Sequence, residues 1–187
     1  YNMKRIFDLL TSLTFFVILL PVSILIIILI YIQLGRPIFF VQKRPGFKSK
    51  PFYIYKFRSM LEPSSDSLIY KSDIKRMTRL GWFLRSSSLD EIPQLWNVIV
   101  GEMSLVGPRP LLMEYLPLYN KRQLHRHDVL PGITGWAQVN GRNNLTWQVK
   151  FEFDVWYVNN QTFLLDMKIL LMTLRKVFLG KDITTNG

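Results

Sequence analysis

The segment LLTSLTFFVILLPVSILIIILIYI, residues 9–32, decides how this chain is organised, because it contains twenty-four residues without a charge. As one straight α-helix it would be about 36 Å long, enough to cross the roughly 30 Å hydrocarbon core of a bilayer. The apolar part is longer than that of a cleavable signal peptide, and no small-residue cleavage site follows it. We therefore expect residues 9–32 to form a membrane helix that stays in the protein.

Pro21 stands at the centre of this run, where a proline removes a backbone donor and kinks or breaks a helix. Each half is then about 18 Å long, about half the thickness of the bilayer. Both flanks are basic, with Lys4 and Arg5 before the run and five cations within residues 36–50 after it. The positive-inside rule places both flanks in the cytoplasm. The pattern therefore favours a re-entrant helix that bends at Pro21, with a spanning helix as the alternative.

The net charge is concentrated after this run. It is +11 over 187 residues, and residues 36–87 carry twelve Lys and Arg against three Asp and Glu, so +9 of it lies there. Such a field attracts polyanions, which include nucleic acid, anionic lipid and phosphorylated substrates, although a basic face can also be simply solvated. The chain has no cysteine, which excludes disulfides and thiolate metal sites.

Local patterns after the run predict an α+β fold that is mainly helical. Residues 37–60 alternate in part around the turn-forming RPGFKSKP and predict a small β-hairpin, followed by a polar loop over residues 61–73. Gly101 is expected to end a helix that begins near Glu91. Helical spacing of apolar residues predicts amphipathic helices over residues 75–84, 91–100 and 112–126.

Residues 163–179 predict a longer amphipathic helix. Its apolar face either packs in the core or lies at a membrane interface, and Asp166 lies away from that face. We expect two units, a re-entrant membrane anchor over residues 1–35 and a compact, membrane-associated cytosolic domain over residues 36–187 with amphipathic interfacial helices around it.

Asp90 and Glu91 are adjacent carboxylates in a basic part of the chain. Asp90 could simply cap the helix predicted over residues 91–100, since aspartate is a favoured N-cap. Two such charges repel by about 4 kcal/mol at 4 Å with an effective dielectric of 20. Both stay ionised in a closed site only with cations nearby, and Arg85 and Arg109, the latter between two prolines, are the candidates.

A Mg²⁺ ion would complete the charge balance, because it takes few carboxylates and shares phosphate oxygens. Carboxylates, Mg²⁺ and arginines together are typical of phosphoryl transfer, in which a carboxylate can also be the nucleophile. Lys56 and Arg58 in YKFRSM and Arg142 in the Gly-rich LPGITGWAQVNGR are further candidate substrate contacts. His125 and His127 form an H-x-H without further His or Cys ligands, so we do not expect zinc.

The motifs QKRPG, YKFRSM, LRSSSLDEIPQL, GEMSLVGPRPLL, HRHDVLPGITGWAQVNGR and FLLDMKILLMTL follow one another over nearly the whole chain. This combination resembles the bacterial sugar transferases, the minimal monotopic phosphoglycosyl transferases. The resemblance implies transfer of a sugar 1-phosphate from a UDP-sugar to a polyprenyl phosphate, normally undecaprenyl phosphate, with release of UMP. It also implies a re-entrant helix broken at a proline.

The resemblance further implies roles for the site residues. Asp90 would be the nucleophile of a ping-pong reaction with a covalent aspartyl-phosphosugar intermediate, and with Glu91 it would hold Mg²⁺ against the diphosphate. Arg85 and Arg109 would bind phosphate oxygens. The secondary contacts would be Lys56, Arg58 and Arg142.

The same resemblance implies an enzyme of the bacterial inner membrane whose catalytic domain lies on the cytoplasmic face. Its partners would be the UDP-sugar and the lipid phosphate and not nucleic acid, and a homo-oligomer is compatible with the family. Two other interpretations stay open from the residues alone. One is a non-enzymatic membrane-surface module that binds anionic lipid or nucleic acid, and the other is a metal-dependent phosphatase or nuclease.

Overall fold

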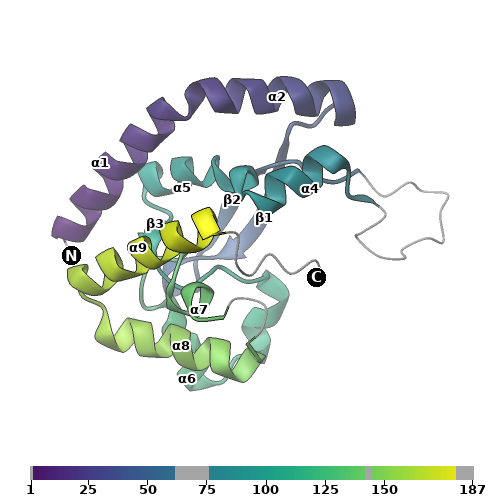
Figure 1. Ribbon diagram of the computed structural model, residues 1–187. Coiled ribbons are helices and arrows are strands. Elements are labelled where there is room, and N and C mark those ends of the chain that lie inside the picture. Colours follow the sequence, from purple (N-terminus) through teal and green to yellow (C-terminus); the bar gives the residue numbers. More distant parts are fainter. Residues whose placement is uncertain (1, 62–75, 142–144, 180–187) are drawn as a thin grey trace.

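The computed structural model describes residues 2–61, 76–141 and 145–179, in which helices surround two small sheets (Figure 1). The α-helices are α1 (Asn2–Ile18), α2 (Leu20–Leu34), α4 (Arg79–Ser86), α5 (Gln94–Val100), α6 (Lys121–Leu124), α7 (Trp136–Val139), α8 (Trp147–Asn160) and α9 (Phe163–Leu179). The strands are β1 (Phe39–Pro45), β2 (Pro51–Phe57), β3 (Ser104–Val106) and β4 (Gly132–Thr134). Short 3₁₀ helices are η1 (Phe47–Ser49), η2 (Leu89–Glu91), η3 (Met113–Leu118) and η4 (His125–His127).

The N-terminal helices α1 and α2 form a bent pair, and Figure 1 shows them arching over one side of the molecule. The break lies at Leu19, and the two helices are bent by 58°. Pro21 occupies the first turn of α2, where the N–H that it lacks has no helical partner. The predicted bend is therefore confirmed, two residues before the predicted position. Among the described residues no single helix is long and apolar enough to cross a bilayer, whereas this bent pair passes that test together.

Both helices of the pair pack on the rest of the chain, and α2 contributes two buried side chains. Ile26 and Ile30 on α2 are 4% and 0% exposed, and they belong to the same core cluster as residues from the hairpin and from α4, α5 and α9. The fully buried members from these parts include Leu84, Val98 and Ile169. The division into residues 1–35 and 36–187 stays a prediction.

A buried polar network fixes the first half of the pair. Lys4 donates to Asp166 on α9 over 2.7 Å, and the Tyr157 hydroxyl donates to the other oxygen of the same carboxylate over 2.6 Å. Asp8 accepts from the Ser104 hydroxyl over 2.7 Å. Because these groups are buried and mutually satisfied, α1 is held against β3, α8 and α9 by directional contacts as well as by apolar packing.

Helix α9 confirms the helix predicted over residues 163–179, but the buried side differs from the prediction. Leu164, Leu171 and Leu174 on the predicted apolar face are 79%, 68% and 52% exposed. Asp166, predicted to lie away from that face, is buried because Lys4 and Tyr157 satisfy its carboxylate. The described part of the chain thus leaves this leucine face of α9 half exposed or more.

The β-hairpin predicted within residues 37–60 is confirmed. Strands β1 and β2 pair antiparallel from Phe39 opposite Phe57 to Pro45 opposite Pro51. Phe52 and Ile54 on β2 face the core. Because side chains alternate along a strand and directly opposite residues share a face, Lys56 and, across the pair, Arg44 project from the face of Phe52 and Ile54.

Three predicted helices differ from the observed ones. The helix predicted over residues 75–84 begins at Arg79, because Thr78 caps it by accepting from the Gly81 N–H. The helix predicted over residues 91–100 is split into η2 and α5, although Gly101 does end it in a left-handed conformation. The continuous helix predicted over residues 112–126 is wrong. The loop predicted over residues 61–73 lies outside the described residues from residue 62 onward.

The error over residues 112–126 has a local cause. Pro117 interrupts this stretch, so η3 is a 3₁₀ segment. Asn120 then starts α6 with a capping box, in which its side chain accepts from the Gln123 N–H and the Gln123 side chain accepts from the Asn120 N–H. Three short helical pieces therefore replace the single predicted helix.

Candidate active site

The acidic pair lies in η2, a tight turn between α4 and α5. Ser88 enters this turn in a left-handed conformation with φ 57°, and Asp90 is 6% exposed. The predicted capping role of Asp90 is wrong, because the N-cap of η2 is Ser88 and that of α5 is Pro93. Asp90 accepts no hydrogen bond from the part of the chain that the structure describes. Its carboxylate is therefore not engaged by a hydrogen-bond donor of these residues, and its side chain is 8% exposed.

Two cations converge on the neighbouring carboxylate. Glu91 Oε1 accepts from Lys56 Nζ over 2.6 Å and from Arg109 over 2.7 Å. Lys56 Nζ also lies 3.8 Å from Asp90. Strand β2 thus supplies a cation that faces both acids, and Lys56, predicted as a secondary contact, is the cation closest to the pair among the described residues.

The pKa values of the two carboxyl groups are shifted in opposite directions. Burial raises the pKa of Asp90 and the charge of Glu91 adds to this, while Lys56, Arg109 and Arg85 act in the opposite direction without cancelling it. Burial acts in the same way on Glu91, but Arg109 and Lys56 outweigh it and hold its pKa well below the usual range. Divergent pKa values in adjacent acids are typical of sites where the two groups have different tasks.

Arg109 is held from behind by a buried ion pair. Arg126 Nη2 lies 2.6 Å from Asp154 Oδ2 and donates to the Arg109 carbonyl over 2.8 Å. The Arg126 guanidinium also lies over the rings of Tyr119 and Phe151, at 5.8 and 5.7 Å from their centroids. The ion pair between Arg126 on η4 and Asp154 on α8 therefore holds the backbone of Arg109, whose side chain reaches Glu91.

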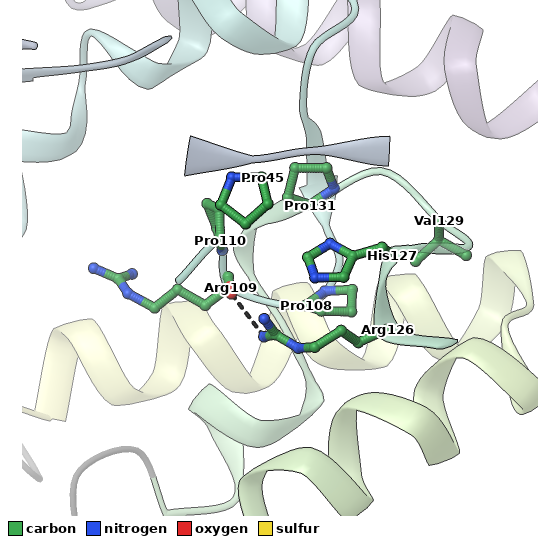
Figure 2. Close-up of a pocket in the computed structure, with 8 residues that line it drawn as sticks. All are labelled: Pro45, Pro108, Arg109, Pro110, Arg126, His127, Val129 and Pro131. Atoms are coloured by element: carbon green, nitrogen blue, oxygen red, sulfur yellow. Dashed lines mark hydrogen bonds between the residues drawn. The ribbon is translucent and has the colours of Figure 1, made fainter. Parts of the chain in front are cut away.

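Figure 2 shows a small space behind Arg109, which is too tight to admit a water molecule. The Arg109 side chain points away from this space, and its carbonyl oxygen accepts the hydrogen bond from Arg126. His127 points into it and is kept neutral, because burial and the charge of Arg126 lower its pKa to about 4. The lining residues are Pro45, Pro108, Arg109, Pro110, Arg126, His127, Val129 and Pro131.

The other three residues predicted to contact substrate have different outcomes. Arg85 is close enough for its charge to lower the pKa of Asp90. Arg58 is buried and donates to the carbonyls of Leu34 and Arg36 at the end of α2, and it makes no ion pair with the acidic pair. Arg142 lies outside the described residues.

Sequence reasoning missed the pair of Arg126 and Asp154. Arg126 lies in HRHD, where the two histidines drew attention as metal ligands, but His125 is exposed with its Nδ1 2.7 Å from Asp128 and His127 is buried against Gly46. Asp154 lies 28 residues further along the chain, and no local signal connects it with Arg126.

The donor set suits a hard divalent cation. Both oxygens of Asp90 and Oε2 of Glu91 accept no hydrogen bond from the described residues, so three carboxylate oxygens are free of protein donors. Mg²⁺ is usually bound by one or two carboxylates together with waters and substrate phosphates. In the described ranges no group of three or more His, Cys, Asp or Glu is placed to hold a metal ion.

Comparison with known proteins identifies a family for this chain. The family model of the bacterial sugar transferases matches residues 1–180. The "Uncharacterized sugar transferase EpsL" of Bacillus subtilis (strain 168) is 51% identical over 182 residues, which cover 97% of this chain and 90% of that protein.

Two longer relatives have names that specify substrates. The UDP-glucose:undecaprenyl-phosphate glucose-1-phosphate transferase of Klebsiella pneumoniae is 37% identical over 190 residues, covering 96% of this chain and 41% of that protein. The UDP-galactose-lipid carrier transferase of Erwinia amylovora is 38% identical over 189 residues, covering 92% and 39%. The chain therefore spans about two fifths of these two relatives.

The family match covers residues 1–180, a range that includes α1, α2, the hairpin, the acidic pair and α9. The residues that the motifs singled out, Asp90, Glu91, Lys56 and Arg109, meet in one site. This chain belongs to the bacterial sugar transferase family.

Proposed function

We propose that this chain transfers a sugar 1-phosphate from a UDP-sugar to undecaprenyl phosphate and releases UMP, with Asp90 as a covalent nucleophile. The contrast within the acidic pair carries the proposal: Glu91 is engaged by Lys56 and Arg109, whereas Asp90 has a raised pKa and no hydrogen bond from the described residues. A carboxylate that is buried beside cations but not consumed by them is suited to attack phosphorus.

The reaction has two displacements at one phosphorus atom. In the first, an oxygen of Asp90 bonds to the β-phosphorus of the UDP-sugar, the bond from that phosphorus to the bridging oxygen breaks, and UMP leaves with the bridging oxygen. In the second, a phosphate oxygen of the lipid bonds to the same phosphorus and the bond to Asp90 breaks. The product is a polyprenyl diphosphosugar, and Asp90 is restored.

The protein's own cations supply the electrostatic support. Lys56 and Arg109 keep Glu91 ionised, so that the negative charge beside Asp90 is neutralised before the diphosphate arrives. Arg85 and Arg109, whose charges both lower the pKa of Asp90, would bind phosphate oxygens. Mg²⁺, when bound by Asp90 and Glu91, would neutralise diphosphate oxygens during phosphoryl transfer.

The N-terminal helix pair is the proposed membrane anchor. It enters the cytoplasmic leaflet of the inner membrane, bends at Leu19 and returns to the same side, which keeps the basic flanks in water. A broad apolar surface supports this arrangement, because its residues are roughly half exposed or more. They include Ile6, Leu10, Leu13, Val17, Ile24, Leu25, Ile28 and Ile32. The exposed leucine face of α9 supports additional contact with the interface.

The proposed donor is a UDP-sugar. The names of the Klebsiella and Erwinia relatives support a UDP-hexose such as UDP-glucose or UDP-galactose, and N-acetylated amino sugars are also compatible with the family resemblance. A screen of UDP-sugars for UMP release, with detergent-solubilised protein, Mg²⁺ and undecaprenyl phosphate, tests the activity and identifies the donor.

The covalent step has its own experiment. Labelled donor without lipid acceptor should leave one labelled phosphosugar on the peptide that contains Asp90, and Asp90→Asn should abolish both the adduct and UMP release. A wild-type protein that releases UMP without an adduct would exclude the covalent nucleophile. Phosphate release without sugar incorporation would instead assign a phosphatase. Salt-sensitive binding of anionic vesicles without any turnover would assign a surface-binding module.

A further inference from the structure

Arg44 on β1 differs from other partly or fully buried Lys and Arg residues in the groups that its side chain contacts. Several of those cations contact a carboxylate or the negative end of a helix. The carboxylate pairs are Lys4 with Asp166, Lys56 and Arg109 with Glu91, and Arg126 with Asp154, while Arg5 donates to the Val98 and Ile99 carbonyls at the end of α5. Arg44 has neither kind of partner among the described residues.

The contacts of Arg44 are with neutral groups. Its guanidinium donates to the Gln42 amide oxygen over 2.6 Å and to the Pro110 carbonyl over 3.4 Å, and its buried Nε–H has no acceptor. Glu114 acts on it from beyond ion-pair distance. Burial and the charge of Arg109 lower its pKa, so two cations share this region while only Arg109 has a carboxylate beside it. An unpaired and partly desolvated charge is costly, and an incoming anion would remove that cost.

The hairpin places Arg44 next to the active site. It lies opposite Phe52, on the same face of the hairpin as Lys56, and its hydrogen bond to Pro110 joins it to the segment that carries Arg109. Lys56 and Arg109 both contact Glu91, and Arg44 contacts the carbonyl of Pro110, the residue that follows Arg109.

The direction of the hairpin indicates which anionic substrate would reach Arg44. β1 begins near the end of α2, where Arg58 holds the Leu34 carbonyl, and leads away from the helix pair (Figure 1). Arg44 is five residues beyond Phe39, about 17 Å along the strand. It is therefore on the side remote from the proposed membrane anchor, where a water-soluble substrate approaches.

We propose that Arg44 binds a phosphoryl oxygen of the nucleotide donor beside Arg109, on the phosphate that leaves as UMP. This inference rests on the function proposed above and adds to it a residue for the leaving group. A phosphate monoester on the lipid acceptor has the same recognition chemistry, and the two sources are separated by experiment.

The test compares Arg44→Gln with Lys43→Gln. Lys43 is the adjacent cation on the same strand, it is exposed, and alternation turns it to the opposite face, so both changes remove one charge from one strand. Arg44→Gln should raise the KM for the UDP-sugar about 10–100-fold, the range for losing a hydrogen bond to a charged group. Lys43→Gln should stay within about twofold, as expected for an exposed charge. Arg44→Lys should recover part of the loss, since it keeps the charge but not the forked geometry.

Binding of UMP and protein stability provide readouts that a purely structural role would not give. UMP should raise the melting temperature of the wild type and of Lys43→Gln but not that of Arg44→Gln. Without nucleotide, Arg44→Gln should melt at the same or a higher temperature, because the unpaired charge is gone. A lower melting temperature with unchanged UMP binding would assign Arg44 to support of the Pro110 segment and overturn the inference.

The remaining outcomes are also decisive. A raised KM for undecaprenyl phosphate with an unchanged KM for the donor would transfer Arg44 to the acceptor and overturn the donor assignment. Equal donor kinetics in the two glutamine variants would remove any role in binding. If the wild-type protein releases no UMP from any UDP-sugar, the function proposed above fails, which is distinct from a failure of Arg44 in an active enzyme.

Discussion

Asp90 and Glu91 are adjacent in the chain, yet one lysine contacts them unequally. Lys56 Nζ lies 2.6 Å from Glu91 Oε1 and 3.8 Å from Asp90 Oδ2. With Arg109 also on Glu91, one acid is neutralised and the other is left with a raised pKa. The pair therefore combines a charge held by two hydrogen-bonded cations with a carboxylate that accepts no hydrogen bond from the described residues, and its two members should respond oppositely to removal of their charges.

The first prediction concerns stability. Asp90→Asn should raise the free energy of unfolding at neutral pH, because its folded pKa is raised and ionisation is unfavourable in the folded state. Glu91→Gln should lower it by about 1–3 kcal/mol, since Lys56 and Arg109 lose a charged acceptor. Denaturant unfolding of both variants measures the two signs, and a loss in Asp90→Asn would contradict the electrostatic account.

The pH dependence of these effects has a defined direction. The gain in Asp90→Asn should be present above the raised folded pKa and vanish below the ordinary value of 3.8. The contribution of Glu91 is present above its ordinary pKa of 4.5 and is lost as pH falls towards its depressed folded pKa. The deficit of Glu91→Gln should therefore shrink on acidification.

The second prediction concerns the pH profile of UMP release. The charge of Lys56 lowers the pKa of Asp90, so Lys56→Gln should raise that pKa further and move the acid limb of kcat/KM to higher pH. Lys48→Gln is the matched control, because Lys48 is 57% exposed at the hairpin turn and pairs with Asp128. An acid limb that moves equally in both variants would show that the titrating group is not beside Lys56.

The third prediction compares two ion pairs that both reach α8. Arg126 and Asp154 are 2% and 6% exposed, so Asp154→Asn should cost about 3–5 kcal/mol by leaving a buried charge unpaired. Arg122 and Glu152 are 68% and 59% exposed, so Glu152→Gln should cost less than about 1 kcal/mol. Chemical denaturation gives both values, and similar costs would mean that Arg126 is solvated in solution.

The fourth prediction concerns the anchor. The chain has no cysteine, so single cysteines can replace Met3 and Gln33, which are both exposed. In sealed vesicles a membrane-impermeant thiol reagent should reach both positions from the same side. Pro21→Ala restores a backbone donor near the bend, and a fraction of the protein should then expose Met3→Cys on the opposite side. If the two cysteines, each in a chain that keeps Pro21, were labelled from opposite sides of the vesicle, the re-entrant arrangement would be refuted.

The predictable parts of the fold were those encoded in neighbouring residues. The hairpin followed from local alternation around a turn, and Gly101 marked a helix end because it takes a left-handed conformation there. Helix α8 was not predicted. Its sequence WQVKFEFDVWYVNN alternates polar and apolar residues over most of its length, a period that gives no amphipathic helical signal.

The residue types of the site could be predicted from their chemistry, but which of the candidate cations contact the acidic pair could not. Asp90, Glu91 and Arg109 stood out because adjacent acids need cations. Lys56 and Arg58 looked equivalent, since a spacing of two residues puts side chains on one face of a strand. Strand β2 ends at Phe57, however, so Arg58 turns towards the end of α2 while Lys56 stays with the acids. Only the three-dimensional course of the chain separates them.

The bond between Lys4 and Asp166 has a mechanical consequence. It joins the first turn of α1 to α9, and Tyr157 on α8 donates to the same carboxylate, so movement of α1 relative to α8 and α9 would break these contacts. In the proposed membrane setting, a thinner or thicker lipid layer would tilt the enzyme as one rigid piece. In that setting the height of Asp90, the proposed nucleophile, above the acyl chains would depend on the bilayer, and the physical state of the lipid would tune the rate of the proposed transfer.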